Sequence, residues 1–306
     1  MSFAMVFPGQ GSQAIGMMSA LAQEFSVVRE LYTEASDALG IDLWGLTQEG
    51  PIEDLSMTEN TQPALLVAGV AAWRVWQESS GAIPAIMAGH SLGEYTALVC
   101  AGAIPFDQGV TLVRDRGRYM QNAVPEGQGG MAAIIGLDDD VVSKVCAEVA
   151  NGDVLQAVNF NAPGQVVIAG SAAAIERAAP AMKQAGAKRA LALPVSIPAH
   201  SALMSSASEK LAARIQEVDI KLPTIPVLHN CNVSFAETPE QVAQNLVTQL
   251  DSPVLWVASV ERMLNDGINK YVESGPGKVL SGMIKRIAKG SQVGCIDTPD
   301  ALKEQL

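Results

Sequence analysis

The sequence predicts an α/β protein that has a large, mostly parallel sheet and a smaller inserted α+β subdomain. Three observations favour this fold class. Short apolar runs alternate with helix-like segments over most of the 306 residues, which is typical of a parallel sheet covered by helices on both faces. The stretch after Gly127 changes to the order β-α-β-β-α-β. A Gly-x-Ser-x-Gly motif lies where an apolar run passes into a helix-like segment, as in an α/β-hydrolase-like domain.

The composition is that of a compact protein of enzyme size. Hydrophobic residues make up 48% and charged residues 17%, and the net charge of −12 disfavours nucleic acid as a partner, because phosphate binding needs basic surfaces. The 4 cysteines lie far apart without a Cys-x-x-Cys pair, so we expect neither a metal site nor disulfides. The N-terminus shows no signal-peptide pattern, and prolines interrupt the longest uncharged stretch, residues 190–208. We therefore expect a cytoplasmic protein that neither spans nor binds a membrane.

The first predicted strand, residues 4–7, runs into a glycine-rich loop that begins at Pro8. Gly9-x-Gly11 fits part of a dinucleotide-binding fingerprint, but a helical pattern over residues 27–39 stands where that fold needs a second strand. We interpret the loop as a glycine turn that brings backbone N–H groups and Gln10 close to a polar group.

The next predicted helix is buried on every side. Pro63 suits its first helical position, and residues 64–73 form an apolar run without charge. Such a helix packs against a sheet rather than facing solvent.

The Gly-x-Ser-x-Gly motif spans residues 89–93 and matches a nucleophile elbow. An apolar run, residues 85–88, enters it, and a helix over residues 92–101 leaves it, with Gly102 at its end. The glycines tolerate the crowded turn, and the Ser91 hydroxyl stands at a helix N-terminus, where N–H groups can hold an anion. The bare pattern also fits a plain glycine turn with an unreactive serine.

The predicted helix over residues 107–124 carries one anomalous charge. At 100° per residue its apolar side chains share one broad face, and Arg116 alone among the charged residues lies inside that face. An arginine stays protonated and a buried unpaired charge is costly, so Arg116 needs an anionic partner. Two alternatives stay open: an internal salt bridge, or a substrate carboxylate bound bidentately.

The central stretch predicts a ferredoxin-like subdomain over residues 126–195, inserted into a large α/β catalytic domain made of residues 1–125 and 196–306. Its expected strands are 131–137, 154–160, 165–169 and 189–195, and its expected helices are 139–150 and 171–185. We interpret Asn159, Asn161, Pro163 and Gly164 as its middle turn, without a chemical role.

The last third of the chain continues the alternation. We expect a helix to about residue 216, a strand over 225–229, a helix capped by Thr238 that ends near 249–250, a helix over 253–264, a strand at 271–272 and a last long helix opened by Gly275-Pro276-Gly277-Lys278.

A serine nucleophile needs a base, and the chain offers His90, His200 and His229. His90 adjoins Ser91 in a sharp turn, where consecutive side chains point in different directions. His229 ends a strand-like run and equally suits a hydrogen-bonded core position. His200 lies on a loop where the inserted stretch returns to the main domain, which is where clefts form, so we rank His200 above His229.

Several motifs together resemble those of a known family, the malonyl-CoA:acyl carrier protein transacylases of fatty acid synthesis. They are, in order, Pro8-Gly9-Gln10-Gly11-Ser12-Gln13, Gly89-His90-Ser91-Leu92-Gly93-Glu94-Tyr95, Arg116-Gly117, Pro198-Ala199-His200 and Gly275-Pro276-Gly277. The resemblance extends from residue 3 to about residue 295. It implies that Ser91 is the nucleophile and His200 the base. It also implies that the backbone N–H groups of Gln10 and Leu92 form the oxyanion hole, and that Arg116 binds the malonyl carboxylate.

The resemblance further implies that the backbone carbonyl of Gln249 orients the histidine. The reaction would be a ping-pong transfer of malonyl from malonyl-CoA, through a malonyl-serine ester, to the phosphopantetheine thiol of acyl carrier protein. No metal or redox cofactor would be required. Because carrier proteins of this pathway are acidic, docking would need local basic residues, for which Lys188, Arg189, Lys278, Lys285, Arg286 and Lys289 are candidates; a plain solvated surface is the alternative.

Other functions with related motifs remain alternatives. The malonyl transfer subunit of a malonate decarboxylase and a stand-alone polyketide acyltransferase share the same chemistry. A serine esterase shares the elbow but has no need of Arg116 on an apolar face. A non-catalytic module that binds carrier protein would not need Ser91, His200 and Arg116 together.

Overall fold

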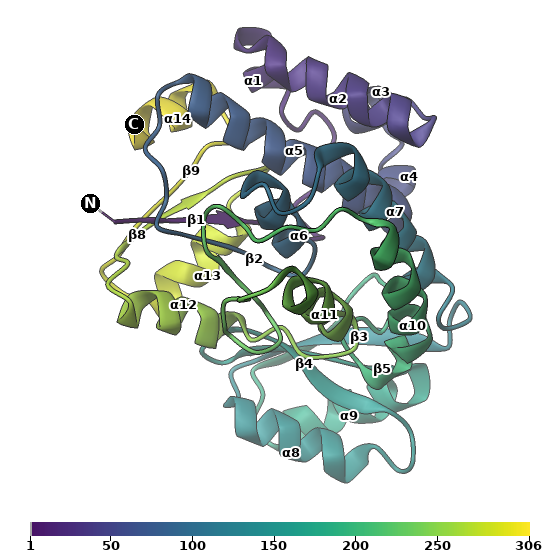
Figure 1. Ribbon diagram of the computed structural model, residues 1–306. Coiled ribbons are helices and arrows are strands. Elements are labelled where there is room, and N and C mark those ends of the chain that lie inside the picture. Colours follow the sequence, from purple (N-terminus) through teal and green to yellow (C-terminus); the bar gives the residue numbers. More distant parts are fainter. Residues whose placement is uncertain (1) are drawn as a thin grey trace.

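The structure is a computed structural model that describes residues 2–306, and its strands form two sheets (Figure 1). The first sheet is parallel and has the order β7-β2-β1-β8-β9. The second is antiparallel and has the order β4-β5-β3-β6. The strands are β1 (Ala4–Phe7), β2 (Ile86–Gly89), β3 (Gly129–Ile135), β4 (Leu155–Ala162), β5 (Gln165–Ser171), β6 (Arg189–Ala192), β7 (Val227–Leu228), β8 (Lys270–Glu273) and β9 (Gln292–Cys295).

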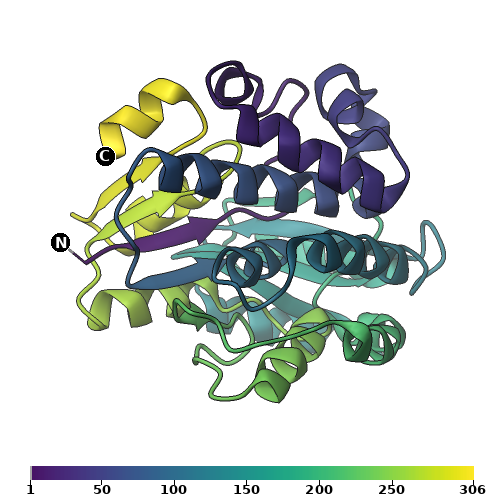
Figure 2. The same cartoon turned by 45° about the horizontal axis from the view of Figure 1, so that its top comes forward.

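The helices are α1 (Ser19–Glu24), α2 (Ser26–Leu39), α3 (Leu43–Glu49), α4 (Ile52–Ser56), α5 (Thr58–Glu78), α6 (Leu92–Cys100), α7 (Phe106–Gln121), α8 (Asp139–Val149), α9 (Ala172–Gln184), α10 (Ser205–Arg214), α11 (Pro239–Leu250), α12 (Trp256–Asn265), α13 (Val279–Ile287) and α14 (Pro299–Gln305). Helices α8 and α9 pack against the antiparallel sheet, and other helices cover both faces of the parallel sheet. Figure 2 shows α5 on one side of β1 and α12 on the other. The mixed α/β class with a parallel sheet, predicted from the alternation, is confirmed.

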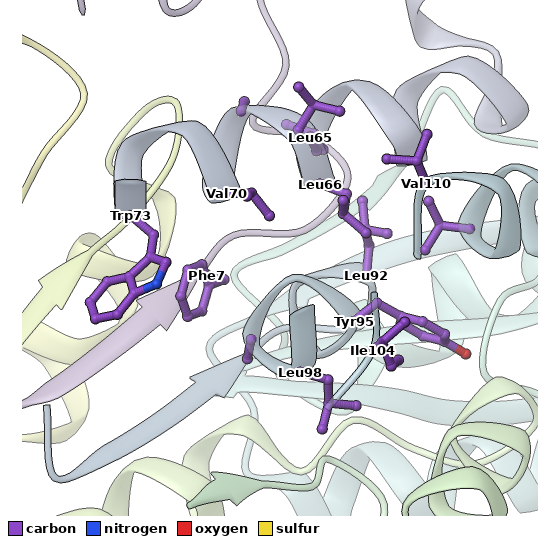
Figure 3. Packing of buried hydrophobic residues seen from close by; sticks show 14 of the residues in the cluster. Phe7, Leu65, Leu66, Val70, Trp73, Leu92, Tyr95, Leu98, Ile104 and Val110 are labelled. Carbon is purple, nitrogen blue, oxygen red and sulfur yellow. The ribbon is translucent and has the colours of Figure 1, made fainter. Parts of the chain in front are cut away.

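Side chains of β1 alternate between two hydrophobic cores, as the period of a strand requires. Met5 and Phe7 pack into the core that contains α5, whereas Ala4 and Val6 pack into the core that contains α12 and α13. Figure 3 shows Phe7 beneath α5, near Val70 and Trp73. The apolar run of α5 is buried as predicted. This helix packs against α6, the helix that follows β2, and against α7.

Helix α5 begins five residues earlier than the position of Pro63 suggests. Thr58 is its first residue, so Pro63 lies inside the helix rather than at its first position. The turn before the proline is held by Thr61, whose hydroxyl donates to the carbonyl oxygens of Leu55 at 2.6 Å and Met57 at 3.1 Å. The helix start at Thr58 is not revealed by the proline pattern alone.

The antiparallel sheet has the predicted element order β-α-β-β-α-β, with α8 after β3 and α9 after β5. The interpretation of Asn159 and Asn161 as turn residues is wrong, because both lie in β4 and are buried. Strand β4 reaches Ala162 because it pairs with β5 as far as the pair Ala162 and Gln165. Val254 bridges to its other edge: the Val254 N–H donates to Val158 O, and the Phe160 N–H donates to Val254 O. Because Val254 takes part in this pairing, the helix expected over 253–264 begins only at Trp256.

Candidate active site

Ser91 lies at the sharp junction between β2 and α6, with φ of 51° and ψ of −106°. A positive φ is strained for a residue other than glycine and costs about 1–3 kcal/mol, so the surroundings must hold it. Asn230 does so from the loop after β7. Its Oδ1 accepts the Ser91 N–H at 2.7 Å, and its Nδ2 donates to the Gly89 carbonyl at 2.7 Å.

The glycines of the elbow are required by space. A Cβ on Gly93 would lie 2.0 Å from the Phe7 carbonyl oxygen, which belongs to the neighbouring strand β1. We expect Gly93→Ala to destabilise the fold by more than about 4 kcal/mol, measured by denaturant unfolding. Gly282→Ala in α13 is the control: its Cβ meets nothing within 4 Å, and we expect a gain of about 1 kcal/mol. A Gly93→Ala protein as stable as the parent would contradict this account.

Ser91 and His200 form a hydrogen-bonded pair. The Ser91 Oγ lies 2.8 Å from His200 Nε2, and His200 Nδ1 lies 2.8 Å from the backbone oxygen of Gln249. A carbonyl oxygen only accepts, so Nδ1 carries the proton and Nε2 is left to accept the serine O–H. The tautomer is therefore set by Gln249, and the geometry is that of a nucleophile with an oriented base.

The other two histidines do not contact Ser91 Oγ. His229 is fully buried, and its Nδ1 lies 2.7 Å from Oε1 of Glu94. His90 Nε2 lies 2.8 Å from Oδ1 of Asn161, which connects the elbow to β4 of the antiparallel sheet. The ranking of His200 above His229 agrees with this geometry.

Burial lowers the pKa of His200 from its ordinary value of 6.5 to about 3, with a further lowering by the charge of Arg116. The imidazole is therefore neutral near pH 7 and able to accept a proton. The unfolded chain binds a proton at His200 below pH 6.5, which the folded chain does not bind until about pH 3, so this site's contribution to stability falls as the pH falls through that window.

We expect His200→Gln to remove this pH dependence, which amounts to about 1.4 kcal/mol per pH unit below 6.5. The difference in unfolding free energy between wild type and variant should therefore shift in favour of the variant as the pH falls. Urea unfolding at a series of pH values between about 7.5 and 5 measures this difference. A difference that is constant with pH would contradict the shifted pKa.

Arg116 lies on α7 and is 1% exposed, as its position on the apolar face predicts. Its guanidinium donates to three neutral oxygens: Nη1 to Gln62 Oε1 at 2.8 Å, Nη2 to Gln249 Oε1 at 3.0 Å, and Nη2 to Ser91 Oγ at 3.1 Å. Its guanidinium carbon also lies 5.0 Å from the centre of the Tyr95 ring. Within residues 2–306 no carboxylate forms a salt bridge with Arg116, so the alternative of an internal salt bridge is wrong.

Gln10 and Leu92 face the same space as Ser91. Both line a cavity of about 230 Å³ that also contains His200 and Arg116. The Gln10 side chain donates to the Thr58 hydroxyl at 3.3 Å, so the loop after β1 does bring it close to a polar group. Leu92 is the first residue of α6, at the end of the helix where N–H groups point outward.

The cavity lies between the two sheets. Its polar end holds the Ser91–His200 pair, and the rest is mainly apolar, with side chains from the antiparallel sheet and from α13 in its wall. They include Met131, Asn161, Val167 and Met283. The walls of the site therefore come from both sheets.

Sequence reasoning missed four residues around the site: Gln62, Glu94, Asn161 and Asn230. One of them had a usable signal, because Glu94 is the single charge in the otherwise apolar helix α6, and the same argument that singled out Arg116 applies to it. The other three are neutral amides, which carry no comparable signal in a single sequence.

Three further observations concern the thiols, metal sites and membrane spans. The 4 cysteines are free thiols. No group of three or more His, Cys, Asp or Glu side chains within residues 2–306 is arranged to hold a metal ion. Over the same range, no helix is long and apolar enough to cross a membrane.

Comparison with known proteins gives a consistent result over almost the whole chain. The model of the acyl transferase domain family matches residues 4–294. The chain is 54% identical over 304 residues to the malonyl CoA-acyl carrier protein transacylase of Salmonella typhimurium, covering 99% of this chain and 98% of that protein.

Solved structures agree. The acyl carrier protein S-malonyltransferase of Vibrio cholerae superposes with a TM-score of 0.97 at 53% identity, covering 99% of each chain. A malonyl-transacylase solved in complex with a type II PKS acyl-carrier protein superposes with a TM-score of 0.99 at 51% identity, covering 100% of this chain and 99% of that one. The chain therefore belongs to the acyl transferase domain family, and within it to the malonyl CoA-acyl carrier protein transacylases.

Proposed function

We propose that the chain transfers the malonyl group of malonyl-CoA to the phosphopantetheine thiol of acyl carrier protein, through a malonyl-serine intermediate, and so supplies fatty acid synthesis. One observation carries this proposal: the buried Arg116 donates to the same Ser91 hydroxyl that faces His200. The site thus pairs a nucleophile with a fixed positive charge, which suits an acyl group that ends in a carboxylate. The names of the relatives support the same donor and acceptor.

In the first half-reaction His200 acts as general base. Its Nε2 takes the proton of Ser91 Oγ as that oxygen attacks the malonyl thioester carbon, and the carbonyl of Gln249 stabilises the imidazolium that forms. The tetrahedral intermediate collapses, the C–S bond breaks, and CoA leaves as its thiol after it receives the proton from His200.

The oxyanion of that intermediate needs two N–H donors. The backbone N–H groups of Gln10 and Leu92 are the proposed pair, since both residues line the cavity at Ser91 and Leu92 begins α6. Donors that are fixed before the reaction stabilise developing charge without reorganisation, and each contributes about 3–4 kcal/mol in comparable sites.

Arg116 is proposed to bind the free carboxylate of the malonyl group. Its hydrogen bonds go to neutral oxygens, which a carboxylate can displace with a stronger, charge-assisted pair. This pair would hold the ester in one orientation and keep it away from water. In the second half-reaction the carrier thiol attacks the ester, with His200 again moving the proton.

We also propose the domain division, the cofactor requirement, the location and the docking surface of the protein. The large unit is α/β-hydrolase-like, and the domains divide at residues 1–125 with 196–306 and at residues 126–195, where the inserted unit is ferredoxin-like. The reaction needs no metal or redox cofactor, and the protein acts in the cytoplasm. Carrier protein docks beside basic residues near α13; Lys278, Lys285 and Lys289 are the candidates, whereas Arg286 is engaged by Gln165 and by the carbonyl of Pro163.

The test is the intact-protein mass after brief exposure to malonyl-CoA. We expect a malonyl adduct that is absent from Ser91→Ala and that disappears when holo acyl carrier protein is added, with malonyl appearing on the carrier. Rapid loss of the adduct to water, without transfer, would instead identify a serine esterase.

A further inference from the structure

Glu94 is a buried carboxylate that the proposed mechanism does not use. It lies in the first turn of α6, three residues after Ser91, and is fully buried. Its Oε1 lies 2.7 Å from His229 Nδ1, and its Oε2 accepts the N–H of Asn230 at 2.8 Å and Nε2 of Gln249 at 2.8 Å. A charge in such a place is tolerated because several hydrogen bonds replace its water.

Two partners of this carboxylate reach directly into the site. Asn230 clamps the strained elbow through its bonds to Ser91 N and Gly89 O. Gln249 donates to the Ser91 carbonyl oxygen at 3.0 Å, while its Oε1 accepts from Arg116 at 3.0 Å. The Glu94 carboxylate is therefore linked to Ser91 through Asn230 and Gln249, and to Arg116 through Gln249.

The Gln249 side-chain amide separates two opposite charges. Its oxygen faces the Arg116 guanidinium, and its nitrogen faces the Glu94 carboxylate. A direct salt bridge would use guanidinium N–H groups and compete with an incoming carboxylate. The Gln249 amide instead connects the two charges, while Arg116 keeps neutral partners that a ligand can displace. The Nε of Arg116 is buried without a hydrogen-bond partner among residues 2–306.

We propose that Glu94 is a positioning residue for malonyl transfer. Through Gln249 and Asn230 it fixes the Arg116 guanidinium and the Ser91 elbow, and it balances the charge of Arg116 without using the guanidinium N–H groups in a direct salt bridge. This role rests on the proposed function. Burial lowers the pKa of Arg116, and the neighbouring Tyr95 and then the Glu94 carboxylate oppose this lowering, which agrees with an electrostatic link between Glu94 and Arg116.

The test compares malonyl-CoA with acetyl-CoA, because acetyl lacks the carboxylate that Arg116 would hold. Glu94→Gln keeps the volume but has one acceptor oxygen for three donors, so Gln249 and Arg116 lose their fixed positions. We expect the ratio of kcat/KM for malonyl over acetyl transfer to fall about tenfold to a hundredfold. Gln249→Met removes the relay but keeps the backbone carbonyl that His200 needs, and should lower the ratio similarly. The double variant should be no worse than the poorer single variant.

Two matched variants distinguish a positioning role of Glu94 from a general loss of protein stability. Glu273, the last residue of β8, is also fully buried, and its carboxylate accepts the N–H groups of Leu280 and Ser281 at the start of α13, so Glu273→Gln should lose stability while the ratio stays unchanged. Gln244→Met makes the same substitution at an exposed position of α11. If Glu94→Gln does not fold, Gln249→Met carries the test.

The two proposals fail in different ways. If the wild type transfers malonyl but Gln249→Met and Glu94→Gln leave the ratio unchanged, or if their losses add in the double variant, the role of Glu94 is overturned and the function stands. If the wild type does not transfer malonyl to carrier protein, both are overturned.

Discussion

Ser91→Ala is expected to lower kcat/KM for malonyl transfer by about five orders of magnitude, because removing a member of a nucleophile–base unit leaves only binding and oxyanion stabilisation. The hydroxyl is the atom that His200 and Arg116 both face, and no other side chain occupies that position. The measurement is transfer of radiolabelled malonyl from malonyl-CoA to holo acyl carrier protein, with initial rates at several substrate concentrations.

Ser208→Ala is the matched control for this loss. Ser208 is also buried, and its hydroxyl donates to Val247 O at 3.0 Å, away from the cavity. We expect its kcat/KM to stay within about threefold of wild type. A Ser91→Ala enzyme that still forms a malonyl adduct would show that the ester is carried by another residue.

Arg116→Ala is expected to produce the second largest effect, and a selective one. The loss of a buried, hydrogen-bonded charge pair costs about 2–5 kcal/mol, which corresponds to about 30-fold to several thousandfold in kcat/KM for malonyl-CoA. Acetyl-CoA makes no such pair, so its kcat/KM should change much less. Rates of acyl-enzyme formation with the two donors, followed by rapid-quench mass spectrometry, give the ratio directly.

Arg114→Ala provides the comparison on the same helix. Arg114 points to the other side of α7, where its Nη1 donates to Leu39 O at 2.6 Å, so its removal should leave the malonyl-to-acetyl ratio unchanged. Equal losses with both donors in Arg116→Ala would assign Arg116 a purely structural role. Unfolding curves of both variants are needed, because Gln62 and Gln249 each lose a partner when Arg116 is removed.

The centre of the site could be predicted because its signals are local. Gly89 is required by contacts with Gly93 and Glu94 within one turn, and the burial of Arg116 follows from the phase of a single helix. The clash that requires Gly93 is with the distant Phe7 carbonyl, but its place in the Gly-x-Ser-x-Gly motif already marked it. His200 was a choice between three histidines, and its place at the return of the chain was enough to rank it first.

What the sequence could not reveal depends on pairing between distant segments. Asn159 and Asn161 have the composition of a turn, but both lie in β4, which pairs with β5 as far as Ala162, and both are buried, with Asn161 beside His90. Asn230 holds the elbow across 139 positions, and no local pattern marks it. Strand β9 was missed because it is short and only partly buried, and it is recognisable as a strand mainly through its pairing with β8.

The strand order β7-β2-β1-β8-β9 has a consequence for synthesis of the chain. Strand β1 is made first, yet one of its two neighbours, β8, is made almost last: Ala4 pairs with Tyr271. Contacts this distant in sequence form slowly, because a long loop must close before any pairing compensates for the lost entropy. In a ribosome-bound chain that has not yet released β8, strand β1 therefore lacks one of its two neighbours and the parallel sheet is incomplete.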